Sequence, residues 1–169
     1  VLRATGSVSP AKVAALTAIP YLCALATQQW LARRSDLRAE RLLHVAVPAL
    51  VSAVAWLLIP SASGQLWTTL LLFCVATGAA FGATGPFWAL VASSFVGTRA
   101  AVAIATVTTC GGIGAFLSPI LVGWAAGRWG ATAASCNYYG LLFAVGALSL
   151  WLGARHIANA SRLRSAIAD

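Results

Sequence analysis

Long uncharged stretches separated by short charged segments dominate the sequence. No Asp, Glu, Lys or Arg occurs from Val13 to Ala32, or from Leu42 to Thr98. A helix of about 20 residues crosses a hydrocarbon core of about 30 Å. The second stretch is long enough for two crossings, and its convincing turn is 60–64, Pro-Ser-Ala-Ser-Gly. The pattern predicts five membrane-spanning helices, at residues 11–32, 42–59, 65–93, 100–126 and 133–154.

The charged segments predict which ends of these helices share a side of the membrane. Loop 33–41 and tail 155–169 are polar, and Arg99 lies in a short connection. Together they hold eight of the eleven basic residues, against three on the other side. Because basic residues gather on the cytoplasmic side, we expect the loop and the C-terminus to lie in the cytoplasm.

Glycine and proline interrupt three of the expected helices. Proline removes a backbone donor and glycine weakens a helix, so both favour bends or local unwinding. Glycine four residues apart also permits close helix packing. We therefore predict bends or packing positions in helices 11–32, 65–93 and 100–126, at Pro20, Gly78, Gly82, Gly85, Pro86, Gly111, Gly112, Gly114 and Pro119.

Composition supports a membrane protein and disfavours other classes. Hydrophobic residues make up 60% of the chain and charged residues 8%, so a polar shell for a soluble domain is lacking. The net charge of +8 sits in connecting segments, which does not suggest nucleic-acid binding. The cysteines, which are far apart in sequence, predict neither a metal site nor a disulfide framework: Cys23, Cys74, Cys110 and Cys136. We expect no cofactor and no enzymatic activity, since no catalytic constellation is present in the sequence.

Three ordered segments carry a family resemblance. The first is Thr17-Ala18-Ile19-Pro20-Tyr21-Leu22, and the second comprises Arg33, Ser35-Asp36, Glu40-Arg41 and His44-Val45-Ala46. The third comprises Gly85-Pro86-Phe87-Trp88-Ala89-Leu90, Gly97-Thr98 and the run 116–124, Phe-Leu-Ser-Pro-Ile-Leu-Val-Gly-Trp. In this order they resemble the eighth helix, the following cytoplasmic loop, and the tenth and eleventh helices of anion:cation symporters. That family belongs to the major facilitator superfamily.

The resemblance implies an all-α integral membrane bundle corresponding to helices 8 to 12 of a twelve-helix transporter. It implies a C-terminal fragment whose N-terminal helices are missing, and the chain contains no methionine. The implied activity of the complete protein is symport of small organic anions, carboxylates above all, with a proton or sodium ion. The implied setting is a bacterial inner membrane, with the lipid bilayer as a further partner.

Two sets of residues are candidates for function. Aromatic and hydroxyl groups near the expected bends predict a substrate cavity for an anion with an apolar body: Tyr21, Phe87, Trp88 and Thr108. The polar loop is either a gating latch or simply a solvated, topogenic segment. Its candidate latch residues are Arg33, Ser35, Asp36, Glu40 and Arg41.

A second hypothesis from another class remains open at this stage. A self-standing five-helix membrane protein could scaffold or oligomerise through small-residue faces, without transporting anything. The reading frame upstream of Val1 would separate the two hypotheses, because a carrier requires about seven further helices.

Overall fold

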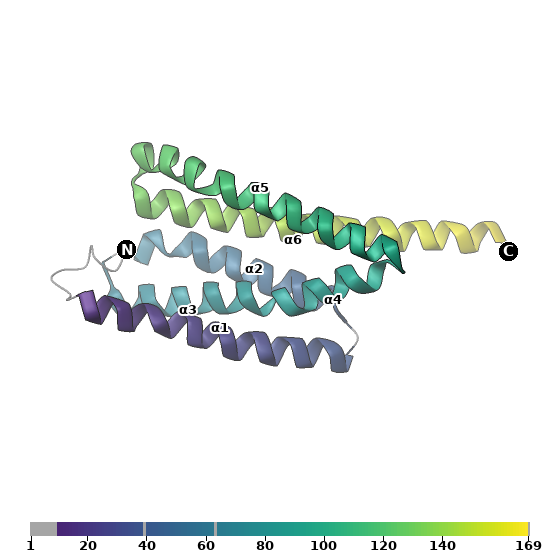
Figure 1. Ribbon diagram of the computed structural model, residues 1–169, viewed down its shortest axis with the longest axis horizontal. Coiled ribbons are helices and arrows are strands. Elements are labelled where there is room, and N and C mark those ends of the chain that lie inside the picture. The colour runs from purple at the N-terminus through teal and green to yellow at the C-terminus, as the bar shows by residue number, and fades with distance from the viewer. Residues whose placement is uncertain (1–9, 39, 63, 169) are drawn as a thin grey trace.

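The computed structural model describes residues 10–38, 40–62 and 64–168, and it is 92% helical. The elements are α1 (Pro10–Arg38), α2 (Leu43–Leu58), the short 3-10 helix η2 (Pro60–Ala62), α3 (Leu66–Gly82), α4 (Thr84–Ser94), α5 (Thr98–Trp129) and α6 (Ala131–Ala168). Figure 1 shows the helices running back and forth along one direction, with α4 continuing the line of α3.

Four helical stretches are long and apolar enough to cross a membrane: Ala11–Arg38, Leu66–Ser94, Thr98–Trp129 and Ala131–Gly153. Helix α2 is apolar but shorter, at 16 residues. The described part of the chain contains no strand. The expected all-α membrane bundle is therefore confirmed, with α2 as the shortest of the five expected spans.

Two helices extend farther than the sequence pattern suggested. Helix α1 continues to Arg38, so most of the expected loop 33–41 is helical. Segment 33–38 contains neither glycine nor proline, and its charged side chains are exposed, so nothing ends the helix there. Helix α6 likewise continues through most of the expected tail 155–169, to Ala168.

The expected interruption in the third span lies at Ala83, between α3 and α4. The Ala83 amide still donates to the Ala79 carbonyl at 3.1 Å. Pro86 follows within the first turn of α4 and has no N–H to donate to the carbonyl of Gly82, four residues earlier. Proline chemistry thus explains an irregular turn at Ala83, whose backbone stays in the right-handed helical region with φ −70° and ψ −19°.

Helix α5 shows no local unwinding at its glycines and proline, and a bend there stays a prediction. It runs from Thr98 to Trp129 without interruption, although it contains Pro119 and three closely spaced glycines. Ser118 bonds back to the Gly114 carbonyl at 2.9 Å beside the proline. Helix α1 is also continuous across Pro20. Membrane helices tolerate such residues when neighbouring groups satisfy the backbone.

Tryptophan and arginine mark both ends of the bundle. Arg34 stacks over Trp30 with 5.2 Å to the ring centre, and Arg155 over Trp151 with 3.9 Å. Arg128 lies over Trp124 at 4.3 Å. In Figure 1 the C-terminal end of α1 and the protruding end of α6 lie on one side, and the end of α5 on the other. Such pairs are typical of the interface between hydrocarbon and water.

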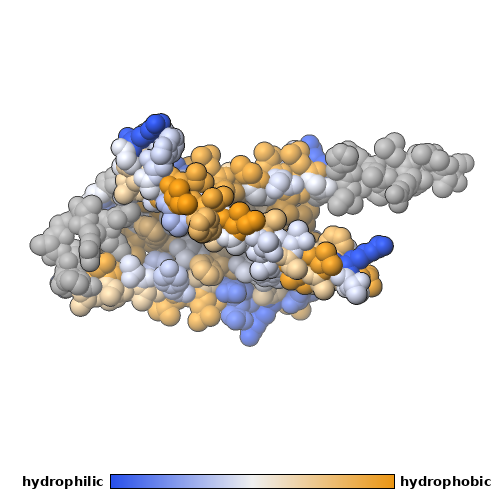
Figure 2. Space-filling view, turned by 45° about the horizontal axis from the view of Figure 1, so that its top comes forward, coloured by the Kyte–Doolittle hydropathy of each residue, from blue (hydrophilic) through white to orange (hydrophobic). Residues whose placement is uncertain are grey.

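Small residues form the core, and large apolar residues face outward. The buried hydrophobic positions include Ala24, Ala53, Ala76 and Ala147, which let helices approach closely. Figure 2 shows hydrophobic side chains over much of the visible face. Helix α5 has no buried residue along its length. This inversion of the water-soluble pattern fits a protein whose outer surface contacts lipid.

Candidate functional site: an aromatic pocket between four helices

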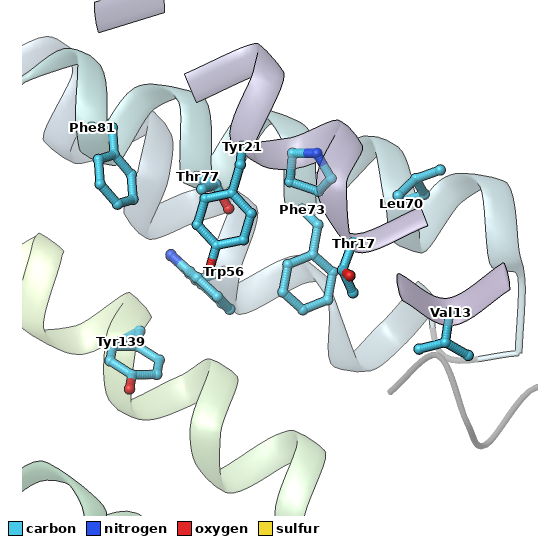
Figure 3. Close-up of a pocket in the computed structure, with 10 residues that line it drawn as sticks. Val13, Thr17, Tyr21, Trp56, Leu70, Phe73, Thr77, Phe81 and Tyr139 are labelled. Atoms are coloured by element: carbon cyan, nitrogen blue, oxygen red, sulfur yellow. The ribbon is translucent and has the colours of Figure 1, made fainter. Parts of the chain in front are cut away.

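A cavity of about 820 Å³ opens between α1, α2, α3 and α6. Figure 3 shows side chains from these helices directed toward a common space. The lining residues are Val13, Thr17, Pro20, Tyr21, Trp56, Leu70, Phe73, Thr77, Phe81 and Tyr139. All ten are uncharged, and half of them are aromatic.

Trp56 of α2 links the rings of this pocket. Its ring centre lies 5.3 Å from that of Phe73 at an interplanar angle of 81°, and 5.3 Å from that of Tyr139. Across the pocket, Tyr21 meets Phe81 edge-on at 6.3 Å. Edge-on pairs are favourable beyond their buried area. Ring contacts thus join α2 to α3 and α6, and α1 to α3, around the pocket.

The polar groups of the pocket are few and differ in availability. The Trp56 Nε1–H is buried and has no hydrogen-bond partner. Thr17 is committed to the Ala14 carbonyl at 2.8 Å. Tyr21 is 64% exposed, so its hydroxyl is accessible. An indole N–H and a phenol could bind an acceptor on a ligand whose body lies against the rings.

The four cavity residues expected from sequence do not share one site. Tyr21 lines the aromatic pocket, whereas Phe87 lines a second cavity of about 670 Å³ between α4, α5 and α6, which Arg99 also lines. Trp88 packs edge-on against Phe87 at 5.3 Å, outside both sets of lining residues. Thr108 is exposed on α5 and donates to the Ile104 carbonyl at 2.8 Å.

Sequence reasoning missed the residues that complete the pocket, above all Trp56 and Tyr139. A signal was present in α3, where Phe73, Thr77 and Phe81 recur every four residues and therefore share a face. Val13, Thr17 and Tyr21 repeat the same spacing in α1. Two parallel rows of this kind indicate facing walls, but the contribution of α2 and α6 depends on tertiary packing.

The five latch candidates occupy different environments. Arg41 Nη1 donates to the Ala89 carbonyl of α4 at 3.2 Å. The Glu40 carbonyl accepts from His44 Nδ1 at 2.7 Å. Ser35 is 1% exposed and its hydroxyl has no partner. Arg33 and Asp36 are exposed on the last turns of α1. The Arg41 contact therefore ties the α1–α2 connection to α4.

The glycines predicted to pack fall into two groups. A Cβ at Gly78 would meet Thr27 Oγ1 at 3.3 Å, and one at Gly85 would meet the Ala32 Cβ at 3.3 Å. Gly82 is also closed off, by Leu31. The glycines of α5, Gly111, Gly112 and Gly114, have open space instead. Close packing through glycine thus occurs between α1 and the α3–α4 span.

Comparison with known proteins shows homology to transporters. The chain is 34% identical over 122 residues to "Putative metabolite transport protein NicT" of Pseudomonas putida, covering 72% of this chain and 28% of that protein. Two Agrobacterium vitis proteins named "Putative tartrate transporter" are 28% identical over 140 residues and 26% identical over 158 residues. These matches cover 83% and 94% of this chain, but 32% and 35% of the relatives.

The bundle and these relatives together define the class: the chain is an integral membrane protein. It is a homologue of proteins named as metabolite and tartrate transporters, and it spans about a third of their length. No family model and no solved structure matches the chain.

Proposed function

We propose that this chain is the C-terminal part of a secondary transporter for small organic anions, of the major facilitator superfamily. The observation that carries the proposal is the match of 72–94% of the chain to about a third of each named transporter. Anion:cation symport by alternating access, with a proton or sodium ion, is the mechanism that we propose for the complete protein. Tartrate in the name of two relatives supports carboxylates as the substrate class.

The irregular turn between α3 and α4 supports a role of the third span in a substrate pathway. Discontinuous helices at membrane depth commonly line the cavities of transporters, because freed backbone groups and bends are tolerated there. The turn at Ala83 is near in sequence to Phe81 of the aromatic pocket and to Phe87 of the second cavity. We assign the apolar body of the substrate to the aromatic pocket, with Tyr21 and Trp56 as candidate donors.

The charge distribution suggests that the positively charged side chain that binds the substrate anion belongs to another part of the complete protein. The ten residues of the aromatic pocket are uncharged, so this pocket offers a carboxylate only neutral donors. Carriers commonly use ionisable residues within the membrane to bind charged substrate or coupling ions. We therefore place the coupling group and the principal anion-binding cation in helices outside this chain.

The Arg41–Ala89 contact supports a gating role for the connection between α1 and α2. It is one hydrogen bond from a charged donor to the backbone of α4, worth about 1.5–3 kcal/mol at most. A bond of this strength can bias two conformations if it forms in only one of them. We propose that this hydrogen bond keeps the cytoplasmic side of the transporter closed. In this proposal the α1–α2 connection and the C-terminus both lie in the cytoplasm.

Uptake by the complete protein tests the proposal. The full reading frame would be expressed in cells lacking tartrate uptake, and accumulation of radiolabelled tartrate and other small carboxylates measured. We expect uptake that collapses with an ionophore specific for the coupling ion. A frame that encodes no further helices, or a full protein that accumulates none of these anions, would contradict it.

A further inference from the structure

The seam between α1 and α3 has a constant register along the two helices. Thr27 donates to the Gly78 carbonyl, 51 positions later, at 2.8 Å. One turn onward, a Cβ on Gly82 would meet Leu31 Cδ1, which repeats the same offset. Rows of residues four apart on each helix therefore face one another, as ridges do in helix packing.

One turn before Thr27, the same register pairs two cysteines. Cys23 of α1 and Cys74 of α3 occupy facing positions in this register, again 51 positions apart. The backbones are close at this level, because a Cβ on Gly78 would lie 3.9 Å from the Cys23 carbonyl carbon. Both thiols are free and partly exposed. Distant in sequence, they form a dithiol in space.

We propose that Cys23 and Cys74 form a modification site, which a hydroperoxide dissolved in the bilayer oxidises to an interhelical disulfide. In the first step the sulfur of one cysteine attacks the terminal oxygen of the hydroperoxide and the O–O bond breaks. The thiol proton passes to the leaving alkoxide, giving a sulfenic acid and an alcohol. In the second step the other thiol displaces the sulfenic oxygen as water, and the S–S bond forms. Two thiols lose two electrons, and the hydroperoxide takes them up.

The position of the dithiol selects the oxidant. Cys23 lies near the middle of α1 and Cys74 at the middle of α3, both within stretches apolar enough to span the membrane. Oxidants that partition into hydrocarbon reach this depth more readily than water-soluble ones. A lipid hydroperoxide, formed within the bilayer itself, has the required chemistry and solubility.

Formation of the bond would act on the aromatic pocket. Tyr21 and Phe73, which line the pocket from α1 and α3, lie within two residues of the two cysteines. A disulfide fixes its two Cα atoms about 4.4–6.8 Å apart. Oxidation would therefore prevent α1 and α3 from separating beside the pocket. This effect does not depend on which substrate the protein transports.

The experiment uses the 169-residue polypeptide reconstituted in lipid nanodiscs and treated with cumene hydroperoxide. Free thiols are then alkylated and counted by mass spectrometry, and peptides are mapped without reduction. We expect loss of two of the four thiols, a Cys23–Cys74 linked peptide, and full recovery of the thiols with a reductant. Reaction with hydrogen peroxide should be at least several-fold slower.

The other two cysteines provide matched controls. Cys110 is exposed on α5 and Cys136 is buried on α6, so the double variant C110A/C136A should form the same linked peptide. The variants C23A and C74A should each lose it while keeping the native circular dichroism spectrum. Linked peptides that involve mainly Cys110, disulfides mainly between molecules, or sulfinic acids without a disulfide would overturn the proposal.

Discussion

Thr27 of α1 donates a hydrogen bond to the backbone carbonyl of Gly78 in α3 at 2.8 Å. The same hydroxyl lies 2.9 Å from the Cys23 carbonyl of its own helix, so it bridges the two backbones. The absence of a side chain at Gly78 allows this approach, because the nearest atom to an added Cβ would be Thr27 Oγ1 itself. The helices thus meet through a polar contact and a glycine.

Replacing Thr27 with valine should weaken the α1–α3 seam. The variant keeps the shape of the side chain and loses the donor, so we expect a loss of about 0.5–1.5 kcal/mol in unfolding free energy, as for interhelical bonds in membranes. Titration with a denaturing detergent would measure it. Thr108→Val is the matched control, because Thr108 bonds only within α5 and is exposed. Equal effects of the two substitutions would contradict this role.

Gly140→Ala should separate α6 from α2. An added Cβ would lie 2.7 Å from Leu57 Cγ and 3.2 Å from the Ala53 carbonyl oxygen, so the helices must shift apart. Overpacking of this kind costs about 1–3 kcal/mol. Thermal unfolding followed by circular dichroism in detergent provides the measurement. Gly146→Ala, on the same helix but with open space around it, should be neutral or slightly stabilising.

Trp56→Phe should be tolerated far better than Trp56→Ala. Phenylalanine retains ring contacts with Phe73 and Tyr139 and removes the buried, unpaired indole N–H. We expect a change within about 1 kcal/mol for phenylalanine and a loss of about 3–5 kcal/mol for alanine. In the complete transporter, raised KM with phenylalanine would support the indole as a substrate donor. Unchanged transport kinetics would assign it a packing role.

Pro86→Ala should make the turn between α3 and α4 a regular helical turn. Alanine restores an N–H that can bond the Gly82 carbonyl, so neighbouring amides at the α3–α4 junction should exchange hydrogen about tenfold or more slowly than in the wild type. In the complete protein we expect at least a tenfold fall in uptake with normal membrane insertion. Pro119→Ala, in the uninterrupted α5, is the comparison and should change both measurements less. Slower exchange without loss of uptake would show that the turn between α3 and α4 has no part in transport.

Asp36→Asn tests the latch in the complete protein. Asp36 is exposed on the last turns of α1, so its stability contribution is small, about 0–1 kcal/mol. We expect uptake to fall severalfold while the amount of protein in the membrane stays constant. Arg41→Gln should behave similarly, because it weakens the bond to the Ala89 carbonyl. Wild-type uptake in both variants would show that segment 33–41 has no gating role and acts only as a solvated, topogenic segment.

Much of the fold follows from the sequence, because apolar stretches between charges specify where membrane helices lie. The division near Gly82 and Pro86 was also accessible, since proline lacks a donor. The length of α1 was not, because charged side chains such as those of Arg33 and Asp36 are compatible with helix once they reach water. Pro119 shows the converse, as a proline in a span whose helix continues.

The candidate site was only partly predictable. Tyr21 belongs to an aromatic pocket, yet Phe87, Trp88 and Thr108 lie elsewhere or face outward. Aromatic residues near a bend are easily recognised in sequence, but the direction in which each one points depends on helix rotation. Trp56 and Tyr139 reach the pocket from helices that carry no local signal for it. Which residues line the pocket therefore depends on tertiary packing, which sequence periodicity alone does not reveal.

Helix α5 is a full-length span with no side chain buried, and its polar link to α6 is the 2.8 Å contact between the Ser118 and Tyr138 hydroxyls. Acyl chains solvate apolar side chains about as well as other helices do, so solvation alone does not fix the rotation of such a helix. The Ser118–Tyr138 hydroxyl pair and the complementary shapes of α5 and α6 must set the rotation of α5 instead. The orientation of α5, the most apolar span, thus depends on its few side-chain hydroxyl groups rather than on its many apolar side chains.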